Sequence, residues 1–204
     1  MRSHRLAPDP DNVHWGYFDA RLSPRLAISS GEHVTISTVS GGPELMPAPP
    51  HVIPPELPAI HKTHTPKLGP HICTGPVAVH GAKPGQVLQV DIERIDVLCD
   101  WGYNAVRPLA GALPYDFPET RTIHITLDRA RMQWRLPWGQ EVPVAPFFGV
   151  IAVAPPAARF SQAESSSPVQ ADFVPTFTWF HGRFKKNGCS SPVKWERGTI
   201  ISAQ

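Results

Sequence analysis

Residues 87–93 read VLQVDIE, an uninterrupted alternation of apolar and polar side chains. Successive side chains of a β-strand point to opposite faces, so Leu88, Val90 and Ile92 would share one face and the polar residues the other. After Arg94 the apolar residues move to odd positions, which predicts a β-bulge at that point. This stretch predicts a half-buried strand and sets the fold class as β-rich.

The same period of two recurs towards the N-terminus. Leu26 and Ile28 alternate with polar or small neighbours, and Val34 and Ile36 do so again. The dipeptide Ser30-Gly31 between them is a turn signal. Together these features predict a β-hairpin.

Further alternation lies towards the C-terminus, at 123–127 and 132–136, while the run 147–154 is apolar on both faces and predicts a fully buried strand. No long segment keeps the spacing of an amphipathic helix. The sequence therefore predicts a mainly β protein, a sandwich or barrel-like β-rich domain with Pro-rich loops and few helices.

Proline is the compositional outlier, with 25 prolines in 204 residues. Many of them fall in residues 41–70, which predicts a long loop, because proline fixes φ and interrupts helices. Hydrophobic residues make up 41% of the chain, enough to fill a core. The length predicts one domain with an irregular extension.

Charge and cysteine usage exclude several classes of protein. The net charge is +2 without a basic stripe, so we expect no nucleic-acid partner. No apolar run approaches the ~20 residues of a membrane span, and the first ten residues lack the apolar stretch of a signal peptide. Cys73, Cys99 and Cys189 form no metal-binding spacing or disulfide framework. A cytoplasmic location is expected, with no membrane partner.

The character of the sequence changes after Pro155-Pro156. Residues 157–204 contain six Lys or Arg and three Asp or Glu, a net charge of +3, which leaves −1 for the first 156 residues. The segment has aromatic residues but no sustained periodicity. We therefore expect a domain at 1–156 and a different kind of sequence at 157–204.

Two arrangements of histidine and cysteine suggest chemistry. His61 and His64 are three residues apart and are a candidate metal pair, although the residues around them do not enforce convergence, and solvated loop histidines are the alternative. Cys73 lies two residues after His71, so the two would point the same way on a strand and could form a nucleophile–base pair. The alternative is a buried structural cysteine.

The stretch HWGYFDA at 14–20 places a histidine, an acid and three aromatic rings close together. One interpretation is an N-terminal segment that anchors its rings in the core. The other is one wall of a polar pocket. The residues alone leave both interpretations open.

These residues belong to a longer ordered pattern that resembles the acetamidase/formamidase family. The stretch HICTGPVAVHGAKPG at 71–85 carries much of the resemblance. Other blocks follow the family's order and cover nearly all of residues 12–156. The matching blocks lie at 14–20, 30–31, 34–36, 40–44, 71–85, 100–104, 107–111, 116–120, 136–139, 146–150 and 152–156.

The resemblance implies a hydrolase that cleaves the C–N bond of short linear amides, such as formamide and acetamide, to carboxylate and ammonia. It also implies a β-rich fold, a homo-oligomer, a small amide as substrate and, in the full-length family, a divalent metal ion. The cofactor of this chain is unknown from its residues. His14, Asp19 and His71 lie in family-like motifs and are the candidate catalytic residues, each with a structural role as the alternative.

Residues 157–204 depart from the family pattern. Family members continue into a Gly-Gly-Asn-x-Asp segment and later Asp, His and Glu positions, whereas this tail has no such segment and His181 is its sole histidine. We therefore expect a frameshift, a truncation or an aberrant gene model near residue 157, with a genuinely diverged variant as the alternative. The alternative function is a catalytically inactive family member that acts as a binding protein, with Trp179, Phe180 and Lys185-Lys186 as candidate partner contacts. Strands left without partners would favour self-association.

Overall fold

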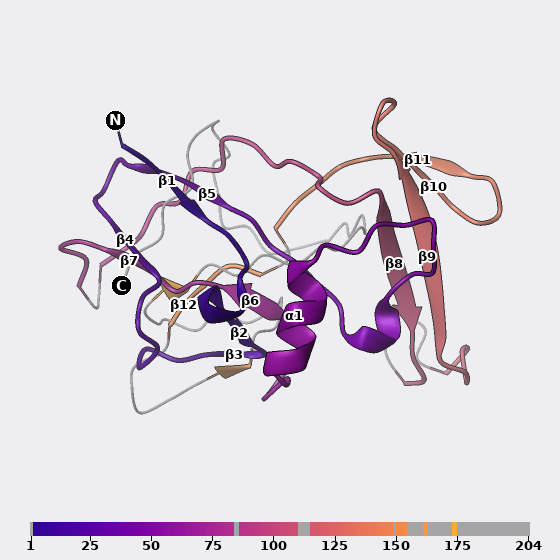
Figure 1. The fold of residues 1–204 in the computed structure, drawn as a ribbon, viewed down its shortest axis with the longest axis horizontal. Coiled ribbons are helices and arrows are strands. Elements are labelled where there is room, and N and C mark those ends of the chain that lie inside the picture. The colour runs from indigo at the N-terminus through magenta and orange to yellow at the C-terminus, as the bar shows by residue number, and fades with distance from the viewer. Residues whose placement is uncertain are drawn as a thin grey trace. The chain divides into compact units, whose positions relative to one another are not determined.

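The computed structural model describes residues 2–83, 86–109, 115–148 and 150–154, together with the backbone of 161–162 and 173–174 (Figure 1). The chain divides into two compact units. Unit 1 comprises Met1–Gly41, Pro55–Ile95 and Pro146–Gln204, and unit 2 comprises Gly42–Pro54 and Asp96–Ala145. Most of the predicted tail at 157–204, including Trp179, Phe180 and Lys185-Lys186, lies outside the described residues.

Two parallel ladders form one hydrophobic cluster in unit 1. Strand β1 (Ser3–Leu6) pairs with β5 (His33–Ile36), and β4 (Leu26–Ile28) pairs with β7 (Val77–Val79). The apolar side chains on the inner faces of these strands pack together, and Leu88 packs against them from outside the ladders. The buried members of the cluster are Leu6, Ile28, Val34, Val77 and Val79.

The predicted hairpin at 26–36 is wrong, although both of its strands exist. The turn is present, with Gly31 at φ 84° and the Glu32 amide donating to the Ser29 carbonyl over 3.1 Å. The two strands then diverge, because each pairs in parallel with a strand from elsewhere in the chain. The local turn signal was correct, and the pairing depended on distant partners.

Three further short ladders complete the described part of unit 1. Strand β2 (Val13–Trp15) is antiparallel to β6 (Ile72–Thr74), and all six of their residues are buried. Strand β3 (Tyr17–Phe18) pairs with β13 (Ser161–Gln162), and β12 (Ala152–Val153) pairs with β14 (Phe173–Val174). The predicted buried strand at 147–154 is thus reduced to β12 among its described residues.

The strand predicted at 87–93 is not formed, and residues 86–99 belong to no strand. The predicted alternation of burial is present only in part, since Val90 and Ile92 are half-buried and Gln89 and Glu93 exposed, whereas Asp91 is half-buried as well. The change of phase after Arg94 is present too, because Val97 is buried at an odd position. A strand needs the backbone of a neighbour as well as an apolar face, and no ladder joins this segment.

The Pro-rich stretch at 41–70 contains ordered turns in addition to loop. A 3-10 helix covers Pro43–Leu45, as another does at Pro10–Asn12, and helix α1 covers Glu56–Thr63. Leu57 and Ile60 lie three residues apart and are both buried, so they form the apolar face of α1. The expectation of a long loop was therefore wrong over the eight residues of α1.

Unit 2 is an antiparallel meander in which each strand pairs with its neighbour in sequence. The strands are β8 (Trp101–Val106), β9 (Arg121–Asp128), β10 (Gln133–Arg135) and β11 (Glu141–Pro143). Figure 1 shows β8 and β9 as two long adjacent arrows. Trp134 lies opposite Leu127, and their side chains are 2% and 4% exposed. Both strands predicted here, at 123–127 and 132–136, are confirmed.

The segment Gly42–Pro54 is tied to this meander by two side chains. The Trp101 indole nitrogen donates to the Val52 carbonyl over 2.9 Å, and His124 Nε2 donates to the Leu45 carbonyl over 2.8 Å. The prediction of a mainly β protein with few helices is confirmed. Among the described residues, no helix has the length and apolar character that crossing a membrane requires.

Candidate functional site

The candidate site lies around His14, at the centre of strand β2. In the ladder with β6, His14 lies directly opposite Cys73, so the two side chains occupy the same face. Both residues are buried, with His14 4% and Cys73 0% exposed. A polar ring has been placed where the neighbouring positions are apolar.

The imidazole of His14 is surrounded by aromatic rings rather than by hydrogen-bonding groups. The Tyr17 and Phe18 rings meet it edge-on, with centroids 5.4 and 6.5 Å away. Nδ1 and Nε2 are both buried and have no hydrogen-bond partner among the described residues. Buried polar atoms nearly always have a partner, so this exception calls for a functional explanation.

Burial lowers the pKa of His14 from its ordinary value of 6.5 to about 4, because desolvation disfavours the charged form. The Gly75 backbone, which approaches the ring without reaching hydrogen-bond geometry, opposes the lowering of the pKa, while nearby Arg25 and His64 add to it. His14 is therefore neutral at physiological pH. A neutral imidazole offers one N–H donor and one nitrogen acceptor to whatever enters.

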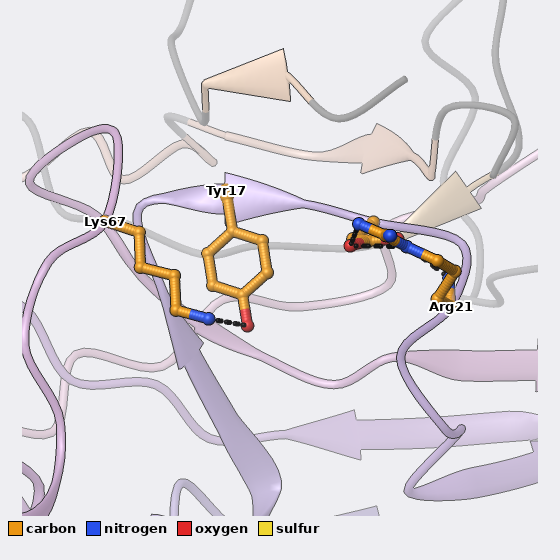
Figure 2. A network of polar contacts seen from close by, with 4 residues as sticks. Tyr17, Arg21 and Lys67 are labelled. Carbon is orange, nitrogen blue, oxygen red and sulfur yellow. Dashed lines mark hydrogen bonds and ion pairs between the residues drawn. The ribbon is translucent and has the colours of Figure 1, made fainter. Parts of the chain in front are cut away.

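The Asp19 carboxylate, unlike the His14 ring, is occupied by hydrogen bonds. Arg21 Nε donates to Oδ1 over 2.9 Å, and Arg21 Nη2 donates to Oδ2 over 2.7 Å, in a bidentate pair (Figure 2). The Arg21 backbone amide also donates to Oδ1 over 2.9 Å. These hydrogen bonds lower the pKa of Asp19, which keeps it ionised. Its charge acts on His14 only weakly, as the smallest of the influences on that ring.

Lys67 contacts the side chain of Tyr17 on strand β3. Its Nζ is 4.6 Å from the centroid of the Tyr17 ring and donates to the Tyr17 hydroxyl in a long hydrogen bond of 3.4 Å. Figure 2 shows the hydroxyl directed at the ammonium group. Neither Tyr17 nor Lys67 was a candidate from the sequence. Lys67 lies in a Pro-rich stretch far from Tyr17 along the chain, so no local pattern links the two.

Cys73 lies across the ladder from His14. The pairing predicted from the sequence was with His71, two residues before Cys73. The Cys73 thiol donates to the backbone carbonyl of His71 over 3.5 Å, and the same carbonyl accepts the Gly16 amide over 2.8 Å. The His71 ring is half-buried. The HWGYFDA stretch also anchors the core, since Trp15 and Phe18 are 4% and 3% exposed. The interpretation as a core anchor is therefore confirmed for these two rings, and the interpretation as one wall of a polar pocket stays a hypothesis.

The histidine pair on α1 is engaged in structural contacts. His61 stacks on Trp15, with centroids 5.6 Å apart, and its Nε2 donates to the Gly41 carbonyl over 2.9 Å. His64 Nδ1 is 2.9 Å from the Thr63 hydroxyl. Within the part of the chain that the structure describes, no three His, Cys, Asp or Glu side chains are grouped so that they could hold a metal ion. The described residues therefore do not fit a divalent metal, and no chemical step is assigned to one.

The geometry thus gives a neutral histidine whose two ring nitrogens have no hydrogen-bond partner among the described residues. Its ring contacts Tyr17, whose hydroxyl accepts a hydrogen bond from the charged Lys67 side chain. Such a set can bind a small polar molecule and exchange protons with it. Among the residues that the structure describes, His14 bonds to no thiol or hydroxyl, so it does not form the nucleophile–base pair of a serine or cysteine hydrolase with them.

Comparison with known proteins gives a family and a fold. The sequence model of the Acetamidase/Formamidase family matches residues 62–173. No curated protein matches the chain.

Three solved structures are similar in fold. A predicted acetamidase/formamidase from the thermophile Thermoanaerobacter tengcongensis matches with a TM-score of 0.59 and 21% identity, over 80% of this chain and 48% of that one. An acetamidase from Bacillus halodurans matches with a TM-score of 0.62 and 21% identity, over 84% and 59%. An acetamidase from Yersinia enterocolitica matches with a TM-score of 0.59 and 18% identity, over 86% and 58%. The chain thus spans about half of the length of these structures.

Proposed function

Because the chain belongs to the acetamidase/formamidase family, we propose that it is an amidase-type hydrolase that converts short linear amides to carboxylate and ammonia. Formamide and acetamide are the proposed substrates. The observation that supports a site in this chain is His14, a buried neutral imidazole whose two nitrogens have no partner among the described residues.

In this proposal His14 binds the attacking water. Its unprotonated nitrogen accepts a hydrogen bond from that water and takes the proton as the new C–O bond forms. The proton then passes to the leaving nitrogen as the C–N bond breaks, so that ammonia departs and the carboxylic acid remains, which gives its own proton to ammonia or solvent to become the carboxylate. General acid–base catalysis of this kind contributes about 10²–10⁴ in rate.

Burial of the ring carries a chemical cost. An imidazole with a pKa of about 4 is a weak base, so the water it activates is a weak nucleophile. The reaction then depends on stabilising the negative charge that develops on the carbonyl oxygen. A site built on His14 therefore requires a hydrogen-bond donor for that oxygen nearby.

Asp19 and His71 remain proposed site residues with different roles. Ionised and paired with Arg21, Asp19 would hold the turn after β3 and add a negative charge near His14, rather than exchange protons. His71 fixes the backbone beside Gly16 through its carbonyl, and in this proposal its half-buried ring lines the site.

The test is ammonia release from formamide and acetamide by the purified chain, with and without added divalent metal. His14→Phe keeps an aromatic ring at the site but removes both nitrogens, and the exposed His80→Gln is the matched control. We expect turnover in the wild type and in the control, with a loss of about 100-fold or more in His14→Phe. No turnover from folded wild-type protein would instead favour the alternative function, a catalytically inactive binding protein.

We further propose a cytoplasmic homo-oligomer with no nucleic-acid or membrane partner. The proposal is supported by a net charge of +2 without a basic stripe and by three cysteines without disulfide spacing. The segment at 86–95 of unit 1, which pairs with no strand among the described residues and exposes Val87, provides a surface on which copies could associate. Light scattering after size-exclusion chromatography measures the assembly directly, and a monodisperse monomer would contradict it.

A further inference from the structure

We propose that Tyr17 and Lys67 form a subsite for an oxygen atom of the substrate, which is the carbonyl oxygen of the amide and then a carboxylate oxygen of the product. The inference rests on the proposed amide hydrolysis and supplies the donor that it needs. It assigns Tyr17 as the group that touches the oxygen and Lys67 as a positioning residue that acts through Tyr17.

The hydrogen-bond inventory of the tyrosine hydroxyl supports this assignment. Its oxygen accepts from Lys67 Nζ over 3.4 Å, which leaves its own hydrogen to donate. In the part of the chain that the structure describes, the side-chain contacts of Tyr17 with His14 and Lys67 provide no acceptor for that hydrogen. A positive charge beside a phenol oxygen makes the O–H a stronger donor, because charge-assisted hydrogen bonds are stronger.

The position of Lys67 is fixed by the backbone of residues 67–71, here called the strap. The Lys67 amide donates to the Trp15 carbonyl over 3.1 Å, and the Trp15 indole donates to the Pro70 carbonyl over 2.9 Å. The Gly16 amide donates to the His71 carbonyl over 2.8 Å. A donor that is placed before the substrate arrives needs no reorganisation during the reaction.

Close contact between the strap and Gly16 restricts this arrangement further. Gly16 has φ 85°, and a Cβ at that position would overlap the Gly69 carbonyl oxygen. Only glycine allows the strap to lie so near to β3. The strap, which includes Lys67, is therefore held in contact with Gly16, the residue immediately before Tyr17.

The subsite lies next to the proposed proton acceptor. The Tyr17 ring is 5.4 Å from that of His14, centroid to centroid, so a ligand held at Tyr17 would lie beside His14. Positive charge from Lys67 and a neutral His14 favour a ligand that carries a partial or full negative charge on oxygen. Amides and short carboxylates share that chemistry.

Binding to the full chain can be measured without turnover. The ¹³Cε1 signal of His14, identified by its absence in His14→Gln, reports titration with acetamide and with acetate. Tyr17→Phe removes only the hydroxyl, Lys67→Met removes only the charge, and Lys62→Met is the control, an exposed lysine on α1. A thermal melt of each variant confirms that it is folded.

We expect Tyr17→Phe to weaken both ligands about fivefold, which corresponds to one hydrogen bond. Lys67→Met should weaken acetate about threefold and acetamide less than twofold, with the difference falling at high salt. Lys62→Met should change neither. Unchanged affinity in folded Tyr17→Phe, or equal losses in both lysine variants, would overturn the subsite.

The same measurements separate the subsite from the proposed function. If the wild type releases no ammonia but Tyr17→Phe still loses affinity, the subsite stands and the hydrolase assignment fails. If the wild type is active and Tyr17→Phe changes neither affinity nor turnover, the hydrolase assignment stands and the subsite fails.

Discussion

Acidification should destabilise the folded chain through His14, and the size of the effect follows from its burial. Folding lowers the pKa of this ring from 6.5 to about 4, so between these values the unfolded chain binds a proton that the native chain does not. Stability therefore rises with pH across this window and is lost as the pH falls. From pH 7 to pH 5 the loss is about 2 kcal/mol, and it approaches about 3 kcal/mol below pH 4.

Carboxylates do not obscure this window. Asp19, Glu32 and Glu141 have lowered pKa values, so the stability they contribute is present above their ordinary pKa values of 3.8 to 4.5. It is lost only as the pH falls below those values. Most of any loss above pH 5 is thus assigned to groups that titrate like His14.

Urea unfolding at pH 7 and pH 5 measures the effect for wild type, His14→Phe and His80→Gln. The free energy of unfolding should fall by about 2 kcal/mol more in the wild type than in His14→Phe, while His80→Gln should behave as the wild type does. An equal pH dependence in wild type and His14→Phe would show that the imidazole titrates normally. The reasoning from burial and missing partners would then be refuted.

Three further predictions follow from particular side chains. At pH 7, His14→Phe should not lower the free energy of unfolding and should raise it by about 1 kcal/mol, since two unpartnered buried nitrogens are removed; the same urea curves measure this. Gly16→Ala should cost about 3 kcal/mol or more because its Cβ meets the strap, whereas Gly31→Ala, with φ 84° and nothing within 4 Å, should cost about 1 kcal/mol. Equal costs would contradict the close approach at Gly69. Trp134→Ala should cost about 3–5 kcal/mol by chemical denaturation because its ring is 2% exposed, and a cost below 1 kcal/mol would contradict that burial.

Local patterns predicted where several strands lie and failed to predict their partners. The alternation of Leu26 and Ile28 predicted strand β4 correctly. Its partner is β7, which lies so far along the chain that no local turn signal could indicate the pairing. The pattern around Leu88 predicted that its side chain packs against the core, which is correct, and a strand, which is wrong. The apolar pattern of a segment indicates which side chains are buried, whereas a strand also requires the backbone of a second segment. The alternation of apolar and polar residues was enough to predict strands and their partners only in the meander, where strands that follow one another in sequence pair.

Helix α1 was missed for a different reason. Its sequence contains Pro58, and proline was taken as evidence for loop. A proline in the first turn costs little, because the amide it lacks would have had no partner there.

For the site, the motif around His14 identified the residue, and only the fold revealed its unpartnered state. That state goes with burial of the ring against the edges of Tyr17 and Phe18, which offer it no hydrogen-bonding atom in these contacts. Tyr17 and Lys67 meet because the strap returns to β3, and this contact between distant residues has no signature in either stretch of sequence.

The contrast between the ladders of the two units has a kinetic consequence. In the meander, β9, β10 and β11 follow one another across short turns, whereas β2 must find β6, and β4 must find β7, across intervening stretches of chain that include the Pro-rich segment. Closing long loops costs chain entropy before any contact compensates for it, so non-local ladders form slowly. We expect the amides of β9 and β10 to gain protection from hydrogen exchange first during refolding. The ladder that holds His14 should form later, so the candidate site is among the last parts of the chain to be assembled.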